Sequence, residues 1–281
     1  VNKTDIINSL PADLSVITAD GTRKANYDGA LIYAADLEGK ITKINLTENF
    51  ILNSDNILKN VSRKSNVPFL YETNVGAGLP IIDTLKNLIA SGDRVHKIQA
   101  VLSGSLNFVF NKFNSSTTFC SIVAQAQKEG FTEPDPKIDL SGIDVARKIL
   151  ILARESGYEI ELEDIVNNSF LSKESLATKT NADFYASLDK NEPHFQQLLL
   201  EANNQNCRLK YVAEFENGRA SVGLQHISSS HSFYNLEGSD NIVLFFTDRY
   251  PEQPLIIKGA GAGADVTASG IFADVIRTGN V

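Results

Sequence analysis

The segment 131–148 gathers acidic residues and a lysine around a turn that leads into a helix. Asp144 and Lys148 are spaced so that on a helix they share one face, with the acid N-terminal to the base. An ammonium held beside a carboxylate is poised to move a proton, and the upstream acids Glu133 and Asp139 complement a cationic amine. The pattern favours a site that binds an amino acid and transfers a proton. The alternative is a capped surface helix that carries an ordinary ion pair.

The residues around this cluster indicate how the chain would position it. Pro134 and Pro136 restrict the approach, because neither a proline nor the residue before it readily enters a helix. Ser141 is the predicted N-cap of the helix, with Asp144 three positions later as in a capping box. The apolar residues that give this helix a buried side are Ile143, Ala146, Ile149, Leu150 and Leu152.

Two glycine-containing turns could bind ions or ligands. YETNVGAGLP (71–80) could expose carbonyl oxygens to a hard cation, with Glu72 as the charged ligand, although a plain turn is the simpler interpretation. LSGSLNF (102–108) could hold a carboxylate with main-chain amides and a hydroxyl. Ser103 or Ser105 could instead act as the N-cap of a helix, and both interpretations can hold together.

A third glycine-rich segment, GAGAGAD (259–265), follows a predicted strand and opens a predicted helix. Free N–H groups and the helix dipole favour anions at such a position, although many loops of this kind are simply tight turns. The segment does not match the GxGxxG fingerprint of dinucleotide-binding proteins, and that pattern occurs nowhere in the chain.

Composition excludes several classes of function. The 281 residues are 42% hydrophobic and 21% charged, an ordinary globular balance, and the formal net charge is -8. Nucleic-acid binding would need a basic face. No apolar stretch is long enough to span a bilayer and no signal peptide is recognised, so we expect a soluble cytoplasmic protein without membrane partners. Cys120 and Cys207 are too few for a disulfide framework, and the histidines lack metal-site spacing.

Hydrophobic periodicity predicts the elements of the first half of the chain. Strands are expected at 14–19, 30–35, 41–46, 67–71 and 96–104. Helices are expected at 55–64, from 81 to Gly92, and at 117–129.

The second half predicts loops and one or two helices at 159–193, a helix at 195–202, and a final helix from about Asp265. Strands are expected at 208–216, 219–227, 242–248 and 254–259. Asn217–Gly218 lies between the first two, which is a strong hairpin signal, so the sheet should be mostly antiparallel. The run at 242–246 is apolar on both faces and predicts cover on both sides, including a homodimer interface.

Four segments together resemble the homoserine dehydrogenase family in their order and spacing. They are YETNVGAGLP (71–80), LSGSLNF (102–108), FTEPDPKIDLSGIDVARKILILARESG (131–157) and GAGAGADVTASGIFADVIR (259–277). The resemblance runs from about Pro68 to Thr278 and is to the dehydrogenase half of bifunctional aspartokinase–homoserine dehydrogenases. It implies reversible, NAD(P)H-dependent reduction of aspartate semialdehyde to homoserine, on the way to threonine, methionine and isoleucine.

The resemblance implies a role for each residue of the acidic cluster. Lys148 would donate the proton to the aldehyde oxygen, with Asp144 beside it as its catalytic partner. Glu133 and Asp139 would bind the substrate amino group. The residues that would lie against the rest of the substrate are Gly104 and Ser105.

The resemblance also implies a cofactor, NADP or NAD, and a monovalent cation such as sodium. The loop containing Gly259, Gly261 and Gly263 would contact the nicotinamide end. Arg23 and Lys24 would meet a 2′-phosphate. The cation would be held by Glu72 with the carbonyl groups of Val75, Ala77 and Leu79.

The fold class that follows is α/β, with a partial Rossmann-like nucleotide domain and an α+β substrate and dimerisation domain whose sheet is largely antiparallel. Residues 1–72, with the C-terminal helix 260–281, would form the incomplete nucleotide-binding domain. Residues 73–259 would form the substrate and dimerisation domain. The expected partners are a small-molecule substrate, a second copy of the chain and a possible fused aspartokinase.

Two features of the family have no match in this sequence. They are the GxGxxG strand–turn–helix that holds the pyrophosphate, and a ThrProAsnLysLys-like segment that carries a second lysine. The chain by itself is therefore expected to bind NADP(H) weakly. The alternative function is a catalytically inactive substrate and dimerisation module that acts in assembly or amino-acid sensing.

Overall fold

The computed structural model describes residues 30–35, 41–46, 62 and 66–279. Contacts divide the chain into two units, residues 1–69 and 70–281, and each unit is described by itself. The strand expected at 14–19, most of the helix expected at 55–64, and Arg23 and Lys24 lie outside the described residues.

The described part of the first unit contains an antiparallel pair of strands, β1 (Ala30–Ala35) and β2 (Ile41–Leu46), as the sequence predicts. The strand expected at 67–71 is wrong, because these residues pair with no described strand. Pro68 has no N–H to donate to a sheet, and Asn66 before it adopts a left-handed φ of 50°. The chain then enters the short 3-10 turn η2 (Glu72–Asn74).

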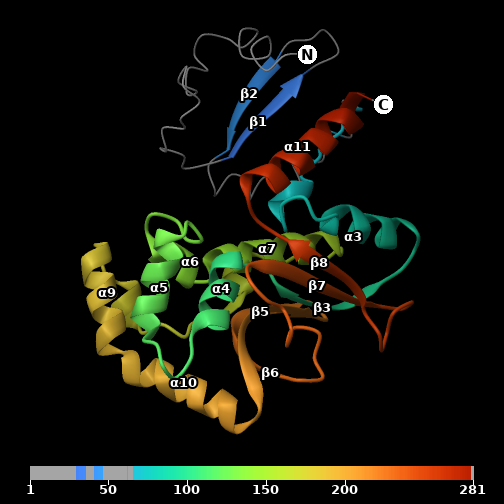
Figure 1. The fold of residues 1–281 in the computed structure, drawn as a ribbon. Coiled ribbons are helices and arrows are strands. Elements are labelled where there is room, and N and C mark those ends of the chain that lie inside the picture. The colour runs from blue at the N-terminus through green and yellow to red at the C-terminus, as the bar shows by residue number, and fades with distance from the viewer. Residues whose placement is uncertain (1–29, 36–40, 47–61, 63–65, 280–281) are drawn as a thin grey trace. The chain divides into compact units, whose positions relative to one another are not determined.

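Six strands form the sheet of the second unit in the order β4-β6-β5-β3-β7-β8 (Figure 1). Every neighbouring pair is antiparallel except the short parallel pair β4–β6, so the expected α/β class with a largely antiparallel sheet is confirmed. Asn217 and Gly218 both have positive φ and connect β5 to β6, as the AsnGly signal predicts. The strands are β3 (Val95–Val101), β4 (Val166–Asn168), β5 (Cys207–Glu216), β6 (Arg219–Ser228), β7 (Asp240–Thr247) and β8 (Leu255–Ala260).

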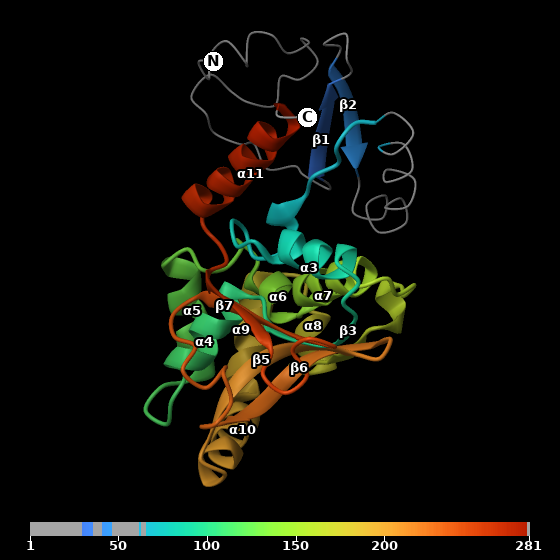
Figure 2. The ribbon, with the colours of Figure 1, turned by 90° about the vertical axis from the view of Figure 1, so that its right-hand side faces the viewer.

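Helices α4, α7 and α10 pack against β5, and α11 follows β8 out of the sheet (Figures 1 and 2). No helix in the described ranges has both the length and the apolar character needed to cross a membrane. The helices are α3 (Ile81–Ala90), α4 (Gly104–Lys112), α5 (Phe119–Lys128), α6 (Pro136–Leu140), α7 (Ile143–Glu155), α8 (Lys173–Leu176), α9 (Asn181–Lys190), α10 (Glu192–Asn204) and α11 (Ala264–Gly279), with a further 3-10 turn η3 (Leu162–Asp164).

A hydrophobic cluster connects the sheet to the segment that follows β6. Its buried members are Val101, Val212, Ile227, Phe233, Leu236, Ile242 and Leu244. Ile242 and Leu244 face this cluster. Val243 and Phe245 point to the opposite face of the sheet, because successive side chains of a strand alternate, and they are buried as well. Much of the apolar run at 242–246 is therefore covered within the unit itself.

The corner between α6 and α7 differs from the sequence-based expectation. Gly142, in a left-handed conformation with φ 75°, precedes α7, and no side chain caps this helix end. Ser141 instead ends α6, although its hydroxyl accepts a hydrogen bond from the N–H of Ile143 at 3.3 Å. The prediction of Ser141 as the N-cap is wrong because the chain reverses within one residue, and only glycine enters the required conformation without strain.

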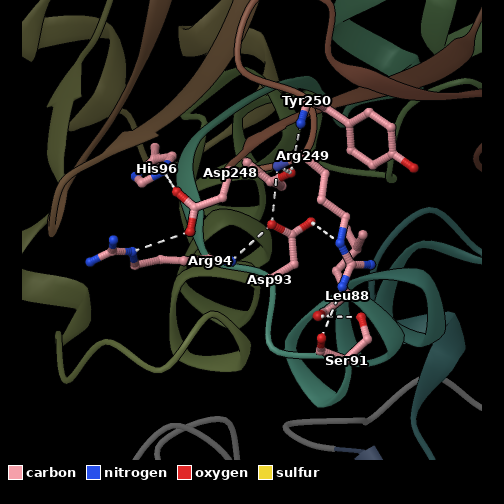
Figure 3. A network of polar contacts seen from close by, with 9 residues as sticks. Leu88, Ser91, Asp93, Arg94, His96, Asp248, Arg249 and Tyr250 are labelled. Atoms are coloured by element: carbon pink, nitrogen blue, oxygen red, sulfur yellow. Dashed lines mark hydrogen bonds and ion pairs between the residues drawn. The ribbon is translucent and has the colours of Figure 1, made fainter.

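A polar network fixes the turn from α3 to β3 against the end of β7 (Figure 3). The buried carboxylate of Asp93 accepts hydrogen bonds from the main-chain N–H groups of Arg94, at 3.0 Å, and Arg249, at 3.3 Å. The guanidinium of Arg249 donates to the carbonyl of Ser91 at 2.8 Å, and His96 pairs with the exposed Asp248. These contacts orient β3, whose other end leads to α4.

The corner generates the first prediction. A Cβ on Gly142 would need the left-handed conformation and would also overlap the hydroxyl of Tyr211. Gly142→Ala should therefore lower the free energy of unfolding by about 2–4 kcal/mol. Gly130→Ala is the matched control, because Gly130 has φ 79° but open space around its missing Cβ. In Gly130→Ala the free energy of unfolding should fall by only about 1 kcal/mol. Urea titration of both variants measures the two losses. Equal losses for the two variants would contradict the proposed steric constraint.

Candidate active site

The start of α4 brings together three of the residues that the sequence singles out. Ser103 caps the helix by accepting a hydrogen bond from Leu106 N at 3.2 Å, as expected. Ser105, in the first turn, donates its hydroxyl proton to Asp139 Oδ1 at 2.8 Å. The second oxygen of Asp139 accepts from Glu133 N at 2.9 Å. Asp139 therefore joins α6, α4 and the loop after α5.

The environment of Asp139 disfavours its charged form. Burial raises the pKa of its carboxyl above the ordinary value of 3.8, and the nearby charge of Asp144 acts in the same direction. The hydrogen bonds from Glu133 N and Ser105 oppose this shift in pKa. A cationic group would restore favourable electrostatics, because it would offset both the desolvation and the repulsion from Asp144.

Lys148 is held by two partners on different elements. Its ammonium lies 2.7 Å from Asp144 Oδ2 one turn earlier on α7, and donates to the carbonyl of Leu102 at 2.9 Å. The side chain of Lys148 is 20% exposed and that of Asp144 is 53% exposed, so the pair is accessible from solvent. An ammonium has three protons, and the described residues accept two of them.

Glu133 is placed less firmly than the other acids. Its main-chain N–H donates to Asp139, but its side chain is exposed, and within the described residues no hydrogen bond to its carboxylate is found. The free carboxylate lies in the loop before α6, whose N-cap is Asp135. Glu133 is therefore available to an incoming ligand rather than committed to the fold.

Glu72 lies at the N-terminal end of α3 and is buried. Its two carboxylate oxygens each accept a main-chain hydrogen bond of 2.7 Å, from Ile82 and Asp83. Burial raises the pKa of Glu72, and these two hydrogen bonds oppose the rise. The simpler structural explanation therefore applies to Glu72, because its carboxylate caps the N-terminal end of α3.

The main-chain carbonyls of this turn are the other candidate cation ligands, and that of Leu79 already accepts a hydrogen bond from Ile81 N at 2.8 Å. Within the described residues no group of three or more His, Cys, Asp or Glu side chains could hold a metal ion, so main-chain carbonyls would supply most of the ligands. The turn carries the carbonyls of Val75, Ala77 and Leu79, with Ala77 at φ 52°. Carboxylate oxygens keep further lone pairs after one hydrogen bond each. A single charge with neutral oxygens fits a hard cation of low charge.

The 71–80 turn also packs directly against α11 and the loop before it. A Cβ on Gly78 would lie 2.6 Å from the carbonyl of Val266, and one on Gly270 would lie 2.6 Å from Thr73 Cγ2. A Cβ on Gly259, near the end of β8, would lie 3.1 Å from Leu79 Cδ2. Two of the four motif segments thus meet through glycines, where no larger residue would fit.

Residues around the start of β7 contact two further motif glycines, Gly104 and Gly261. A Cβ on Gly104 would lie 3.0 Å from the carbonyl of Ser239, and one on Gly261 would overlap the side chain of Asn241. Asn241 is fully buried, and neither polar atom of its side chain has a described hydrogen-bond partner. Gly263 has open space around it at the start of α11.

Sequence reasoning missed three polar residues of this region, Asn107, Lys210 and Asn241. The two asparagines lie inside apolar stretches and read as ordinary helix and strand positions. The one available signal was Lys210, a lysine between Leu209 and Tyr211 in a strand whose neighbours are otherwise largely apolar.

The fold and the site define an α+β protein whose acidic cluster and paired lysine suit a small amino acid. The sequence profile of the homoserine dehydrogenase family matches residues 80–276. The chain belongs to this family, so the resemblance inferred from the four motifs is confirmed.

Similar proteins include both bifunctional and single-function members. The chain is 45% identical over 224 residues to the chloroplastic bifunctional aspartokinase/homoserine dehydrogenase 1 of Zea mays, covering 78% of this chain and 24% of that protein. It is 41% identical over 230 residues to the homoserine dehydrogenase of Schizosaccharomyces pombe, covering 79% and 61%. The chain thus spans about a quarter of the bifunctional relative and less than two thirds of the yeast one.

Solved structures share this fold. A Candida auris protein of unknown function is 41% identical with a TM-score of 0.71, covering 75% of this chain and 60% of that one. A hyperthermophilic archaeal homoserine dehydrogenase in complex with NADPH is 26% identical with a TM-score of 0.61, covering 81% and 60%.

Proposed function

We propose that the chain works as part of an NAD(P)H-dependent homoserine dehydrogenase that reversibly reduces L-aspartate 4-semialdehyde to L-homoserine. The observation that carries this is the ammonium of Lys148, held between Asp144 and the carbonyl of Leu102 beside the acidic cluster. Membership of the homoserine dehydrogenase family supports the reaction. No observation favours the alternative of an inactive module.

The proposed proton donor is Lys148. Its ammonium, held 2.7 Å from Asp144 Oδ2, would give a proton to the aldehyde oxygen as the carbonyl is reduced. In the reverse direction the same nitrogen, once neutral, would take the proton from the homoserine hydroxyl. The bound nicotinamide would supply the hydride.

The other residues would orient the substrate. Glu133 and Asp139, together with Asp144, would bind the substrate ammonium. The N-terminal end of α4, at Gly104 and Ser105, presents free N–H groups that suit the substrate carboxylate. Opposite charges at the two ends of this site would fix which way the amino acid lies.

We further propose NADP(H) as the cofactor, with NAD(H) as the other candidate, because an archaeal relative is described in complex with NADPH. The loop of Gly259, Gly261 and Gly263 would approach the nicotinamide end. Arg23 and Lys24 would meet a 2′-phosphate. A monovalent cation such as sodium would be held by Glu72, Val75, Ala77 and Leu79, where it would stabilise the turn that packs on α11.

The assembly and setting of the protein are also proposals. Relatives support a fused aspartokinase half. The division into a nucleotide-binding part, 1–72 with 260–281, and a substrate and dimerisation part, 73–259, is proposed from the motifs. A cytoplasmic location is proposed from composition, whereas the plant relatives are named as chloroplastic.

The first functional prediction concerns Lys148. In the full-length protein, Lys148→Ala should lower kcat for homoserine oxidation by about 10²–10⁴-fold, because the positioned proton donor is lost. Lys128→Ala is the control, since Lys128 ends α5 on an exposed surface. Both variants should keep the wild-type circular dichroism spectrum. A kcat near the wild-type value in Lys148→Ala would remove this residue from the mechanism.

The second functional prediction concerns the acids. Glu133→Gln and Asp139→Asn should each raise KM for homoserine by about 10–100-fold, the equivalent of a charged hydrogen bond of about 1.5–3 kcal/mol. KM for the nucleotide should stay unchanged, as should both constants in the control Glu129→Gln. If only the nucleotide KM rises, the proposed role is wrong.

Asp139 also adds a dependence on pH to this experiment. Because burial raises its pKa, acidification should remove its charge at a pH above the ordinary 3.8, and KM for homoserine should then rise. Asp139→Asn should lack this component of the pH profile.

The third functional prediction is a homodimer. The two edge strands of the sheet expose apolar side chains, with Val166 on β4 57% exposed and Ile256 on β8 45% exposed. Edge strands and exposed apolar residues favour association with a second copy. Sedimentation velocity at micromolar concentration should give the mass of two chains. A clean monomer would defeat this prediction.

A further inference from the structure

Lys210 is a fully buried lysine in the middle of β5, away from the paired lysine of the candidate site. Its ammonium donates to three oxygens: Asn107 Oδ1 at 2.9 Å, Asn111 Oδ1 at 2.6 Å and the carbonyl of Leu236 at 2.5 Å. All three protons of the ammonium are thus used. The two asparagines lie one turn apart on α4, so Lys210 joins β5 to that helix.

Each asparagine also contacts the segment 236–240 through its side-chain NH₂ group. Asn107 Nδ2 lies within hydrogen-bond distance of the carbonyls of Glu237, Gly238 and Asp240, the shortest being 3.1 Å to Gly238. Asn111 Nδ2 donates to the carbonyls of Leu236 and Gly238, at 3.1 and 3.2 Å. The 236–240 segment is therefore held mainly through its carbonyl groups.

The charge of Lys210 determines which way both amides point. An ammonium has only donors, so each asparagine must turn its oxygen toward it and its NH₂ group toward the 236–240 segment. A flipped amide would set oxygen against oxygen at the segment and NH₂ against the ammonium. Replacing Lys210 by an apolar side chain would remove this preference and leave buried oxygens without a donor.

The 236–240 segment borders the candidate active site. A Cβ on Gly104 would lie only 3.0 Å from the carbonyl of Ser239, and Asn241, the second residue of β7, lies against Gly261. A shift of this segment would move the wall beside the proposed carboxylate-binding end of α4. Small displacements of that kind have large effects on substrate alignment.

Burying the ammonium of Lys210 has a desolvation cost, which suggests that the charge has a specific structural or functional role. Burial lowers the pKa of Lys210 to about 8, with Arg208 and Lys258 adding to the fall and Glu237 opposing it. An apolar residue of similar shape would avoid this desolvation. Three well-made hydrogen bonds offset the cost, and they also define the position of the segment.

We propose that Lys210 is a positioning residue for the homoserine dehydrogenase reaction, which through Asn107 and Asn111 holds the 236–240 segment against Gly104. This inference rests on the proposed function. Lys210 touches no reacting atom in it. Its effect is to set where the substrate carboxylate can lie.

Two variants of the full-length protein test the proposal. Lys210→Met removes the charge. Asn111→Asp keeps oxygen acceptors for Lys210 but loses the NH₂ group that holds Leu236 and Gly238. The control is Lys97→Met, because Lys97 is also a strand lysine, paired with Glu214 at 2.5 Å and Glu216 at 3.3 Å.

Both test variants should raise KM for homoserine about 10-fold or more, with a smaller change in kcat and none in KM for the nucleotide. Amide hydrogen exchange over 236–240 should quicken in both. Lys97→Met should change neither measurement. If Lys210→Met fails to fold, Asn111→Asp decides the question, since it preserves the acceptors of the buried charge.

A lower unfolding midpoint with unchanged KM and exchange would show that Lys210 serves stability alone, and would overturn the proposal while leaving the proposed function standing. A wild-type protein that binds NADP(H) but does not oxidise homoserine would overturn the proposed function, and this inference with it.

Discussion

The close approach of the α6–α7 corner to β5 is the constraint on which the candidate site depends. Gly142 turns the chain in a left-handed conformation against the hydroxyl of Tyr211, and α7 begins at the next residue and packs on β5 and β6. That direction takes Lys148 to the carbonyl at the end of β3 and leaves Asp139 just before the turn, within reach of α4. Lys148, the proposed proton donor, and Asp139, a proposed substrate-binding acid, thus flank a corner that is fixed by one backbone conformation and one buried aromatic ring.

Much of the architecture could be predicted from local chemistry. The AsnGly hairpin, the spacing of Asp144 and Lys148, and the N-cap at Ser103 are decided by neighbouring residues, and each appears as expected. Features that depend on distant residues could not be predicted. Ser141 has the right type for an N-cap, but the position of Tyr211 imposes a different corner. The partners of Lys210 lie on α4 and beyond β6, so its apolar neighbours in the strand could mark this lysine as unusual but could not reveal what it contacts.

The glycines of the family motifs allow neighbouring elements to pack closely, a role that the motif sequences alone do not reveal. Gly78 and Gly270 allow α11 to lie against the 71–80 turn, and Gly104 and Gly261 allow close approach of Ser239 and Asn241 at the start of β7. Motifs that resemble ligand-binding loops are therefore also places where elements pack closely, main chain against main chain at Gly78 and Gly104 and main chain against a side chain at Gly261 and Gly270. Because these elements are already in contact, the shape of the region cannot adjust to a ligand by moving side chains at the glycine positions.

The contact between Gly270 and Thr73 joins the last helix of the second unit to its first turn. Nearly the whole unit must be synthesised before this contact can form, and closing so long a loop is entropically unfavourable until most other contacts are in place. The sheet and its covering helices can assemble earlier from nearer neighbours. Docking of α11 therefore requires that the residues between Thr73 and Gly270 have been synthesised, and the turn that carries Glu72 lacks this contact until then.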